Sequence, residues 1–280
     1  MKKFLSVALI QMKVVADDAA ANFALADQLI GQALAERPAQ IALLPECMDI
    51  GWGNPKARQL AQPIPGKHTQ ALAEIAKKHD IWLVAGVTEQ DGTHTYNSAV
   101  MISNAGQLIS KHRKINVCYD VTDVYDIGNT LSAVDTPFGR IGIDICADNF
   151  LSNLAIGHTL ARMGAQVILS PTSWAVSPDH DNTKTPYGDD WTVPYGELSR
   201  LYDISIAGVS NVGPVTCGSR TGWSSIGNSM AYGPGGQLLA TLPFGEDAQC
   251  TAVIDLPVRP SSVHGTLTPE HLRQRGYRGI

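Results

Sequence analysis

Short, almost uninterrupted apolar runs alternate along this chain with longer amphipathic runs. Residues 4–12, 40–46 and 166–171 have the length of strands, and their continuity is typical of strands buried on both faces of a sheet. Residues 19–36 carry apolar side chains at helical spacing, and residues 66–80 are a second predicted helix. Because buried strands alternate with helices, the chain is predicted to form a layered α/β sandwich.

Turn signals divide the remaining strand-like segments. Hairpins are predicted at Asp-Gly between residues 81–90 and 94–103, at Thr-Pro-Phe-Gly within 130–146 and at Gly-Pro-Gly-Gly within 224–242. Further strands are predicted at 204–213 and 250–257, and further helices at 149–165 and 195–203. Since nothing resembles a linker, we expect residues 1–280 to form one domain with a short polar C-terminal tail from about residue 258.

Two segments of the chain resemble each other. Residues 34–45, "LAERPAQIALLP", align with residues 160–171, "LARMGAQVILSP". Each reads as a helix end, a turn, a buried strand and a proline. The similarity fits either chance between two αβ units or one domain built of two related halves.

Composition narrows the class of protein. The net charge of −5 argues against nucleic acid or an anionic membrane as the main partner. Residues 1–15 start with two lysines and an apolar run, but Gln11 and Lys13 interrupt the run, so we expect a buried strand rather than a signal peptide. No apolar segment approaches membrane-spanning length. The five cysteines show no zinc-finger spacing, which favours a reduced, cytoplasmic protein with free thiols.

Three reactive side chains follow strand-like runs. Glu46 ends "QIALLPE", Lys114 ends "QLISKHRK" and Cys146 ends "RIGIDIC". Functional sites in α/β sheets gather at the carboxyl ends of strands, so the three groups are candidates for one site. Each has an alternative reading, because a lone cysteine is usually a small buried hydrophobe and a basic run such as "KHRK" usually faces solvent.

The three groups would suit acyl transfer from an amide or nitrile carbon. A cysteine attacks as the thiolate, and a neighbouring carboxylate can take its proton. A lysine cation close to both can lower the pKa of the thiol and stabilise the oxyanion of a tetrahedral intermediate. The backbone N–H of Ala147, directly after Cys146, is a candidate second donor to that oxyanion.

The chain resembles the nitrilase or carbon–nitrogen hydrolase superfamily. The resemblance lies in "LLPECMDIGW", "KHRKINV" and "IGIDICADNF", with further similarity in "YNSAVMIS", "VDTPFGRIG", "AQVILSPTSW" and "GNSMAYGPGGQLLA". It implies a four-layer α-β-β-α sandwich with two mixed sheets, no cofactor, no metal and a catalytic triad of Glu46, Lys114 and Cys146. It also implies a small-molecule amide substrate and a homodimer or larger homo-oligomer, built by packing around residues 150–163.

Some positions depart from the family pattern. Many members carry a second glutamate after the lysine, and the best-matching position here holds Asp123, which we expect to assist positioning. "Cys-Ala-Asp" is closer to the amidase and carbamoylase branches than the Cys-Trp-Glu of true nitrilases. The predicted function is therefore hydrolysis of a linear carboxamide or N-carbamoyl compound through a thioester. Nitrile hydrolysis, a non-catalytic metabolite-binding role and a Cys-His peptidase are the alternatives.

The candidate substrate-binding residues are aromatic. Trp52 and Trp174 follow the Glu46 and Ser-Pro-Thr-Ser segments, and each could either wall a pocket or lie in the core. Residues 177–191 form a long polar loop whose five acidic and histidine side chains match no standard ligand spacing for a metal. A solvated loop is the expected reading, and a loop that gates the substrate is the alternative.

Overall fold

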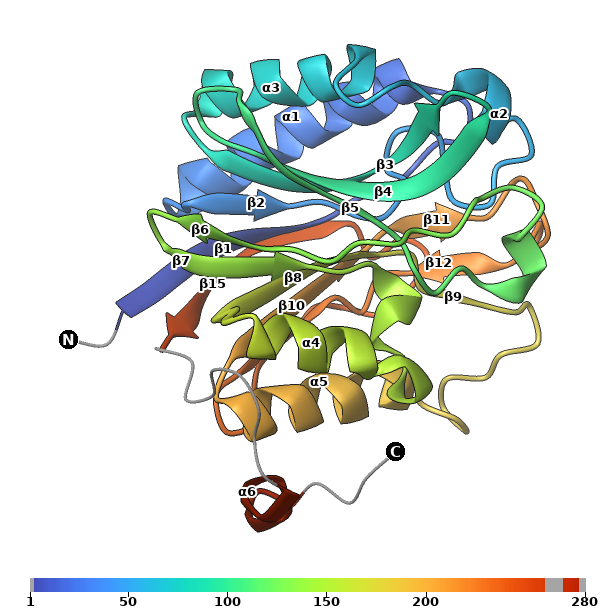
Figure 1. Ribbon diagram of the computed structural model, residues 1–280. Helices are drawn as coiled ribbons and strands as arrows, with labels where there is room; N and C mark the ends of the chain where they lie inside the picture. Colours follow the sequence, from blue (N-terminus) through green and yellow to red (C-terminus); the bar gives the residue numbers. More distant parts are fainter. Residues whose placement is uncertain (1–2, 260–268, 277–280) are drawn as a thin grey trace.

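The chain folds into two six-stranded sheets packed face to face. The computed structural model describes residues 3–259 and 269–276 (Figure 1). The order of the first sheet is β15 (Cys250–Val258), β1 (Lys3–Gln11), β2 (Ile41–Leu43), β3 (Trp82–Asp91), β4 (His94–Ile102) and β5 (Leu108–Arg113). The order of the second is β14 (Gln237–Thr241), β13 (Met230–Gly233), β10 (Ser205–Ser210), β8 (Val167–Thr172), β7 (Gly139–Ile143) and β6 (Ala133–Thr136).

Both sheets mix parallel and antiparallel pairs. β1 runs parallel to β2 and antiparallel to β15, and β8 runs parallel to both β7 and β10. The inner parallel strands are covered on both faces, which explains why their sequences are apolar without alternation. A small third sheet joins β11 (Val212–Pro214), β12 (Ser224–Ile226) and β9 (Ala175–Val176).

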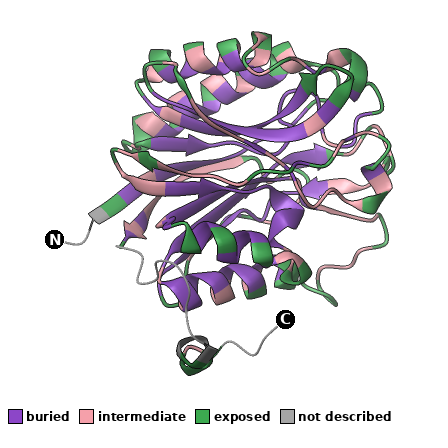
Figure 2. Cartoon of the chain, in the orientation of Figure 1, coloured by how far each residue is buried: buried purple, intermediate pink, exposed green. Residues whose placement is uncertain are grey.

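Helices cover the outer faces of the two large sheets. α1 (Ala19–Glu36) and α3 (Lys67–His79) pack on the first, and α4 (Ala155–Arg162) and α5 (Asp189–Tyr202) on the second (Figure 1). One apolar cluster fills the space under α1 and α3, and a larger one lies between the sheets and beneath α4 and α5. In Figure 2 burial is concentrated on the inner strands and the sheet-facing sides of these helices. The expected α-β-β-α sandwich is confirmed.

The structure differs from the sequence-based elements at a few places. The helix expected at 149–165 is only partly α-helical, because the segment starts as two 3₁₀ turns, η2 (Cys146–Asn149) and η3 (Leu151–Asn153), before α4. The helix expected at 195–203 starts earlier, as α5. The other short helical segments are α2 (Ala57–Leu60), η1 (Tyr119–Val121) and α6 (Pro269–Gln274).

The structure does not test the predictions for the C-terminal tail and for the repeat. Most of the tail, residues 260–268 and 277–280, lies outside the described residues. The repeated segments place β2 and β8 as inner strands of different sheets, packed against each other. In the segment expected to join subunits, Leu151 and Met163 are exposed, and the oligomer stays a prediction.

No helix within residues 3–259 and 269–276 has the length and hydropathy needed to span a bilayer.

Candidate active site

The structure brings the three predicted side chains together between the sheets. Lys114 Nζ donates a hydrogen bond to Glu46 Oε1 at 2.6 Å. Cys146 interacts electrostatically with both, since the Glu46 carboxylate raises and the Lys114 ammonium lowers the pKa of its thiol. All three are buried, with the Lys114 side chain only 2% exposed. Glu46 and Lys114, which are 68 positions apart, therefore share one site with Cys146.

Strand β8 holds two of the three segments in place. The Thr172 carbonyl accepts the Glu46 backbone N–H at 3.0 Å, and Ser170 Oγ accepts the Cys146 backbone N–H at 3.3 Å. On the other side of Glu46, Gly86 of β3 leaves room for the backbone. A Cβ at Gly86 would lie 2.5 Å from the Glu46 Cα, so this close approach requires glycine.

The alternation of side chains along β5 determines which lysine of the basic run faces Glu46. Lys111 and Arg113 point to one face, where both pair with the buried Glu89. His112 and Lys114 point to the opposite face, toward the second sheet. Strand geometry alternates side chains in this way, so only Lys114 of the basic run can reach Glu46.

The Glu46 carboxylate has one occupied and one open oxygen. Glu46 Oε1 accepts hydrogen bonds from Lys114 Nζ and from Asn97 Nδ2, each at 2.6 Å. Glu46 Oε2 is buried and has no hydrogen-bond partner. Burial disfavours the Lys114 cation, but the charge and hydrogen bond of Glu46, together with the nearby Cys146 and Cys118, outweigh burial and raise the pKa of Lys114. Lysine and glutamate thus form a buried ion pair with one oxygen available to another proton donor.

Cys146 sits on a strained turn directly after β7. Its φ is +45°, a left-handed conformation that is uncommon for a residue with a side chain and that recurs at active sites. Burial and the Glu46 carboxylate raise the pKa of the Cys146 thiol well above its usual value, although Lys114 and the Ser173 backbone N–H oppose this. The lowering of this pKa by Lys114, which the sequence analysis expected, is thus only one of several contributions to it. At rest the sulfur carries its proton.

A buried histidine–aspartate contact links the turn of Cys146 to the strand that precedes Lys114. His112 Nε2 lies 2.9 Å from Asp148 Oδ2, and this oxygen also accepts the Ile145 backbone N–H. Asp148 Oδ1 accepts from the backbone and side chain of Asn116. Burial would raise the pKa of Asp148, but His112 holds it below its usual value. This network fixes the position of Cys146 relative to Lys114.

A cavity of about 350 Å³ opens at Cys146, and we call it the Cys146 cavity. Its volume lies in the range of small-molecule sites. Six of the thirteen lining residues are aromatic and three are charged. The lining consists of Trp52, Cys118, Tyr119, Asp120, Cys146, Phe150, Ser173, Trp174, Ala175, Tyr187, Asp190, Trp191 and Arg220.

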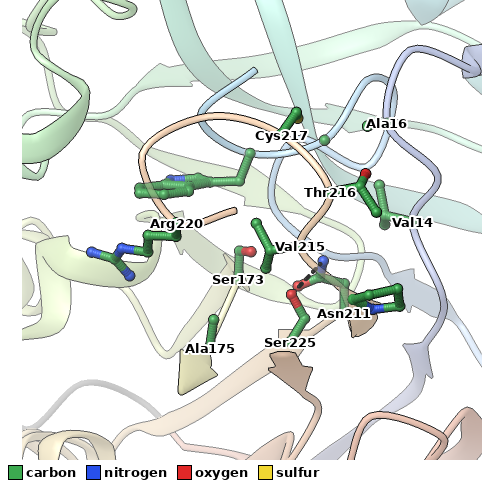
Figure 3. Close-up of a pocket in the computed structure, with 13 residues that line it drawn as sticks. Val14, Ala16, Ser173, Ala175, Asn211, Val215, Thr216, Cys217, Arg220 and Ser225 are labelled. Carbon is green, nitrogen blue, oxygen red and sulfur yellow. Dashed lines mark hydrogen bonds between the residues drawn. The ribbon is translucent and has the colours of Figure 1, made fainter. Parts of the chain in front are cut away.

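A second, much smaller cavity adjoins the first. It holds about 30 Å³ and shares Trp52, Ser173, Ala175 and Arg220 with the Cys146 cavity. Figure 3 shows Arg220 on the opposite side of this cavity from Val14. It has room for no more than about one or two water molecules, so a substrate belongs in the Cys146 cavity.

The remaining predicted site residues fall in different places. Trp52 and Trp174 both line the Cys146 cavity, which favours the pocket reading for each. The Ala147 N–H follows Cys146 in η2 and has no hydrogen-bond acceptor among the described residues. Asp123 is exposed and outside the lining of the cavity. Asp120, one turn earlier, lines the cavity instead, so no contact supports the expected role of Asp123.

Sequence reasoning missed several residues of the site. Asn97 lies in "YNSAVMIS", which carried the family resemblance, but its side chain was not singled out. Tyr187 and Trp191, at the end of the polar loop 177–191, line the cavity, so this segment is more than a solvated loop. Arg220 comes from a Gly-Ser-Arg turn with no signal of its own.

The other cysteines and the acidic side chains form no second site. All five cysteines are free, as expected. Cys47 is buried beside Tyr125, 3.6 Å from its hydroxyl, in a small apolar cluster. Within the described ranges, no group of three or more His, Cys, Asp or Glu side chains could hold a metal ion.

Comparison with known proteins relates the whole arrangement to one family. A family model described as "Carbon-nitrogen hydrolase" matches residues 6–259. An ω-amidase NIT2-B from Xenopus laevis is 28% identical, over 84% of this chain and 83% of the relative. A nitrilase from Pyrococcus abyssi is 30% identical over 89% of both chains.

Solved structures share the fold. A carbon-nitrogen hydrolase from Helicobacter pylori G27 superposes with a TM-score of 0.81 at 18% identity, over 90% of this chain and 89% of the other. An amidase from Nesterenkonia sp. gives a TM-score of 0.76 at 22% identity over 92% of both chains.

Proposed function

The chain belongs to the carbon-nitrogen hydrolase family, and on that premise we propose that it hydrolyses a linear carboxamide or an N-carbamoyl compound through a thioester on Cys146. The observation that carries the proposal is the buried contact of Lys114 with Glu46, because both charges act on the Cys146 thiol and Cys146 lines the cavity. The cavity's size suits a small molecule, whereas a peptide chain needs an open groove. No described histidine lines the cavity, which argues against a Cys-His peptidase.

In the first half of the reaction, Cys146 Sγ attacks the carbonyl carbon of the substrate. Its proton passes to the open Glu46 Oε2, since the other carboxylate oxygen is held by Lys114 and Asn97. The carbonyl oxygen becomes an oxyanion, which the Lys114 ammonium and the Ala147 N–H stabilise. The C–N bond then breaks, and Glu46 returns the proton to the departing nitrogen, which leaves as ammonia or an amine.

In the second half, water cleaves the thioester. Glu46 takes a proton from the attacking water, and the same two donors stabilise the second oxyanion. The S–C bond breaks, the acid is released and Cys146 regains its proton from Glu46. Because the pKa of Cys146 is raised in the free protein, thiolate forms only as the substrate accepts the sulfur. Glu46 is therefore needed in both halves.

Mass spectrometry of the substrate-treated protein tests the assignment. A panel of primary amides, ω-amides and N-carbamoyl amines is screened by ammonia release, and the acyl adduct is mapped on the protein. We expect the adduct on Cys146, loss of turnover in Cys146→Ala and full turnover in the control Cys250→Ala. An adduct on Cys47 together with turnover in Cys146→Ala would end the assignment, and no turnover or adduct with any substrate would favour a non-catalytic protein.

Nitrile hydrolysis is the second candidate, because one relative that matches 89% of this chain is a nitrilase. The same sulfur would attack a nitrile carbon to give a thioimidate, which water converts to the thioester and ammonia. Hexanamide and hexanenitrile form a matched pair for this comparison. Faster formation of hexanoate from the amide supports the amidase, and faster formation from the nitrile supports the nitrilase.

A further inference from the structure

A stack of three aromatic rings forms one wall of the Cys146 cavity. The rings of Phe150 and Trp191 lie 5.0 Å apart at 25°, and those of Trp191 and Trp174 lie 4.7 Å apart at 20°. Trp191 Nε1 donates a hydrogen bond to Tyr187 Oη at 2.8 Å, which fixes the central indole. The wall is therefore rigid, and because stacked rings cover part of each other's faces, it contacts ligands through ring edges and the remaining ring faces, by edge-to-face contact, stacking and dispersion.

The cavity offers no unpaired cation to an anionic substrate. Arg220 Nε donates to Asp120 Oδ2 at 2.9 Å, and its guanidinium lies over the rings of Trp52 and Trp223, 4.6 and 5.1 Å from their centroids. Lys114 is also paired with a carboxylate, that of Glu46.

The remaining charge in the lining is negative. Asp190 is exposed at the start of α5 and has no cationic partner among the described residues. Together the three charged lining residues contribute two carboxylates and one guanidinium. A substrate carboxylate would therefore have to displace Asp120 from Arg220 and would also face Asp190, both of which oppose binding.

We propose that the Cys146 cavity selects amides that carry no carboxylate and whose acyl group ends in an aromatic ring, with this ring lying against the Phe150–Trp191–Trp174 stack. The inference rests on the proposed amide hydrolysis and names its substrate class. Asp120 then acts as a specificity residue, because it occupies the one arginine that could otherwise bind a carboxylate.

Three primary amides separate the substrate classes: 3-phenylpropanamide, hexanamide and the anionic succinamate. For the wild-type protein we expect kcat/KM for 3-phenylpropanamide to exceed that of each other amide by about tenfold or more. An equal or higher value for succinamate or hexanamide overturns this inference but leaves amide hydrolysis standing. Absence of turnover and of any Cys146 adduct with all three overturns the proposed function itself.

The variant Asp120→Asn tests the role of the paired arginine. Removing the carboxylate frees Arg220, so we expect the ratio of kcat/KM for succinamate to that for 3-phenylpropanamide to rise by about tenfold. Asp135→Asn is the matched control, since it breaks an exposed aspartate–arginine pair with Arg140 outside the cavity and should leave the ratio unchanged. An unchanged ratio in Asp120→Asn refutes the role of Asp120.

The variant Trp191→Leu tests the aromatic wall. It should lower kcat/KM for 3-phenylpropanamide by about tenfold and change that for hexanamide by less than about threefold. Equal losses on both substrates contradict selection by the stack. Because Trp191 is buried and its replacement can disturb folding, the Asp120→Asn ratio provides an independent test that does not depend on this variant.

Discussion

A buried carboxyl group beneath the nucleophile provides a test of stability against pH. Asp144 follows β7, two residues before Cys146, and is fully buried. Asn149 Nδ2 donates to its Oδ1 at 2.6 Å, but its Oδ2 makes no hydrogen bond. Burial raises the pKa of Asp144 from 3.8 to about 7, with a further contribution from the neighbouring carboxylate of Asp148.

The sign of the effect follows from proton binding. Below pH 4 the carboxyl is protonated in both the folded and the unfolded chain. Between pH 4 and about 7 only the folded chain holds the proton, so the free energy of unfolding falls as the pH rises, and above this window the loss is complete. A difference of about 3 pKa units at 1.36 kcal/mol each corresponds to about 4 kcal/mol.

Asp144→Asn should remove this loss, because asparagine is neutral at every pH and keeps the oxygen that accepts from Asn149. Urea unfolding followed by tryptophan fluorescence at pH 4.5, 6 and 8 measures the difference between variant and wild type. We expect this difference to move in favour of the variant by up to about 4 kcal/mol between pH 4.5 and 8.

Titrating groups far from Asp144 contribute equally to both proteins and cancel, so only the groups that face Asp144 can differ between them. The nearby groups are the Asp148 and His112 pair, the Tyr195 hydroxyl on α5 and the Cys146 thiol. Asp135→Asn is the control. Arg140 lowers the pKa of Asp135, so its contribution is present above about pH 4 and is lost only below that pH. Parallel curves for wild type and Asp144→Asn would refute the buried neutral carboxyl.

Three further substitutions probe the site. Asn97→Ala removes one donor to Glu46 Oε1, and since such bonds are worth about 1.5–3 kcal/mol, kcat should fall by about tenfold to a hundredfold and the unfolding midpoint should also fall; wild-type kcat would contradict this role. Gly86→Ala places a methyl group against the Glu46 backbone and should cost about 1–3 kcal/mol in urea unfolding, together with activity. Asp148→Asn leaves His112 without its buried partner and should cost about 3–5 kcal/mol, and a loss under 1 kcal/mol would show that the pair is not needed.

Local sequence patterns determined much of the fold. The apolar runs and helical spacing predicted β1, α1, β3, β4 and β8 nearly to the residue, because the burial of one or both faces is written into the order of apolar side chains. Strand alternation also predicts that Lys111 and Lys114 lie on opposite faces, as they do in the structure. The ordered motifs, through the resemblance that they carry, selected Glu46, Lys114 and Cys146 from the many candidates.

Tertiary structure alone decided how distant segments meet. Periodicity shows that a strand is buried but not which strand pairs with it. The sequence therefore could not predict that β15 pairs with β1. It also could not predict that β8 forms hydrogen bonds with the backbone of both Glu46 and Cys146. The same holds for the aromatic wall, for Asp120 rather than Asp123 at the cavity, and for the raised pKa of Asp144. These properties depend on packing between residues that are far apart in sequence, and a local pattern carries no information about its eventual neighbours.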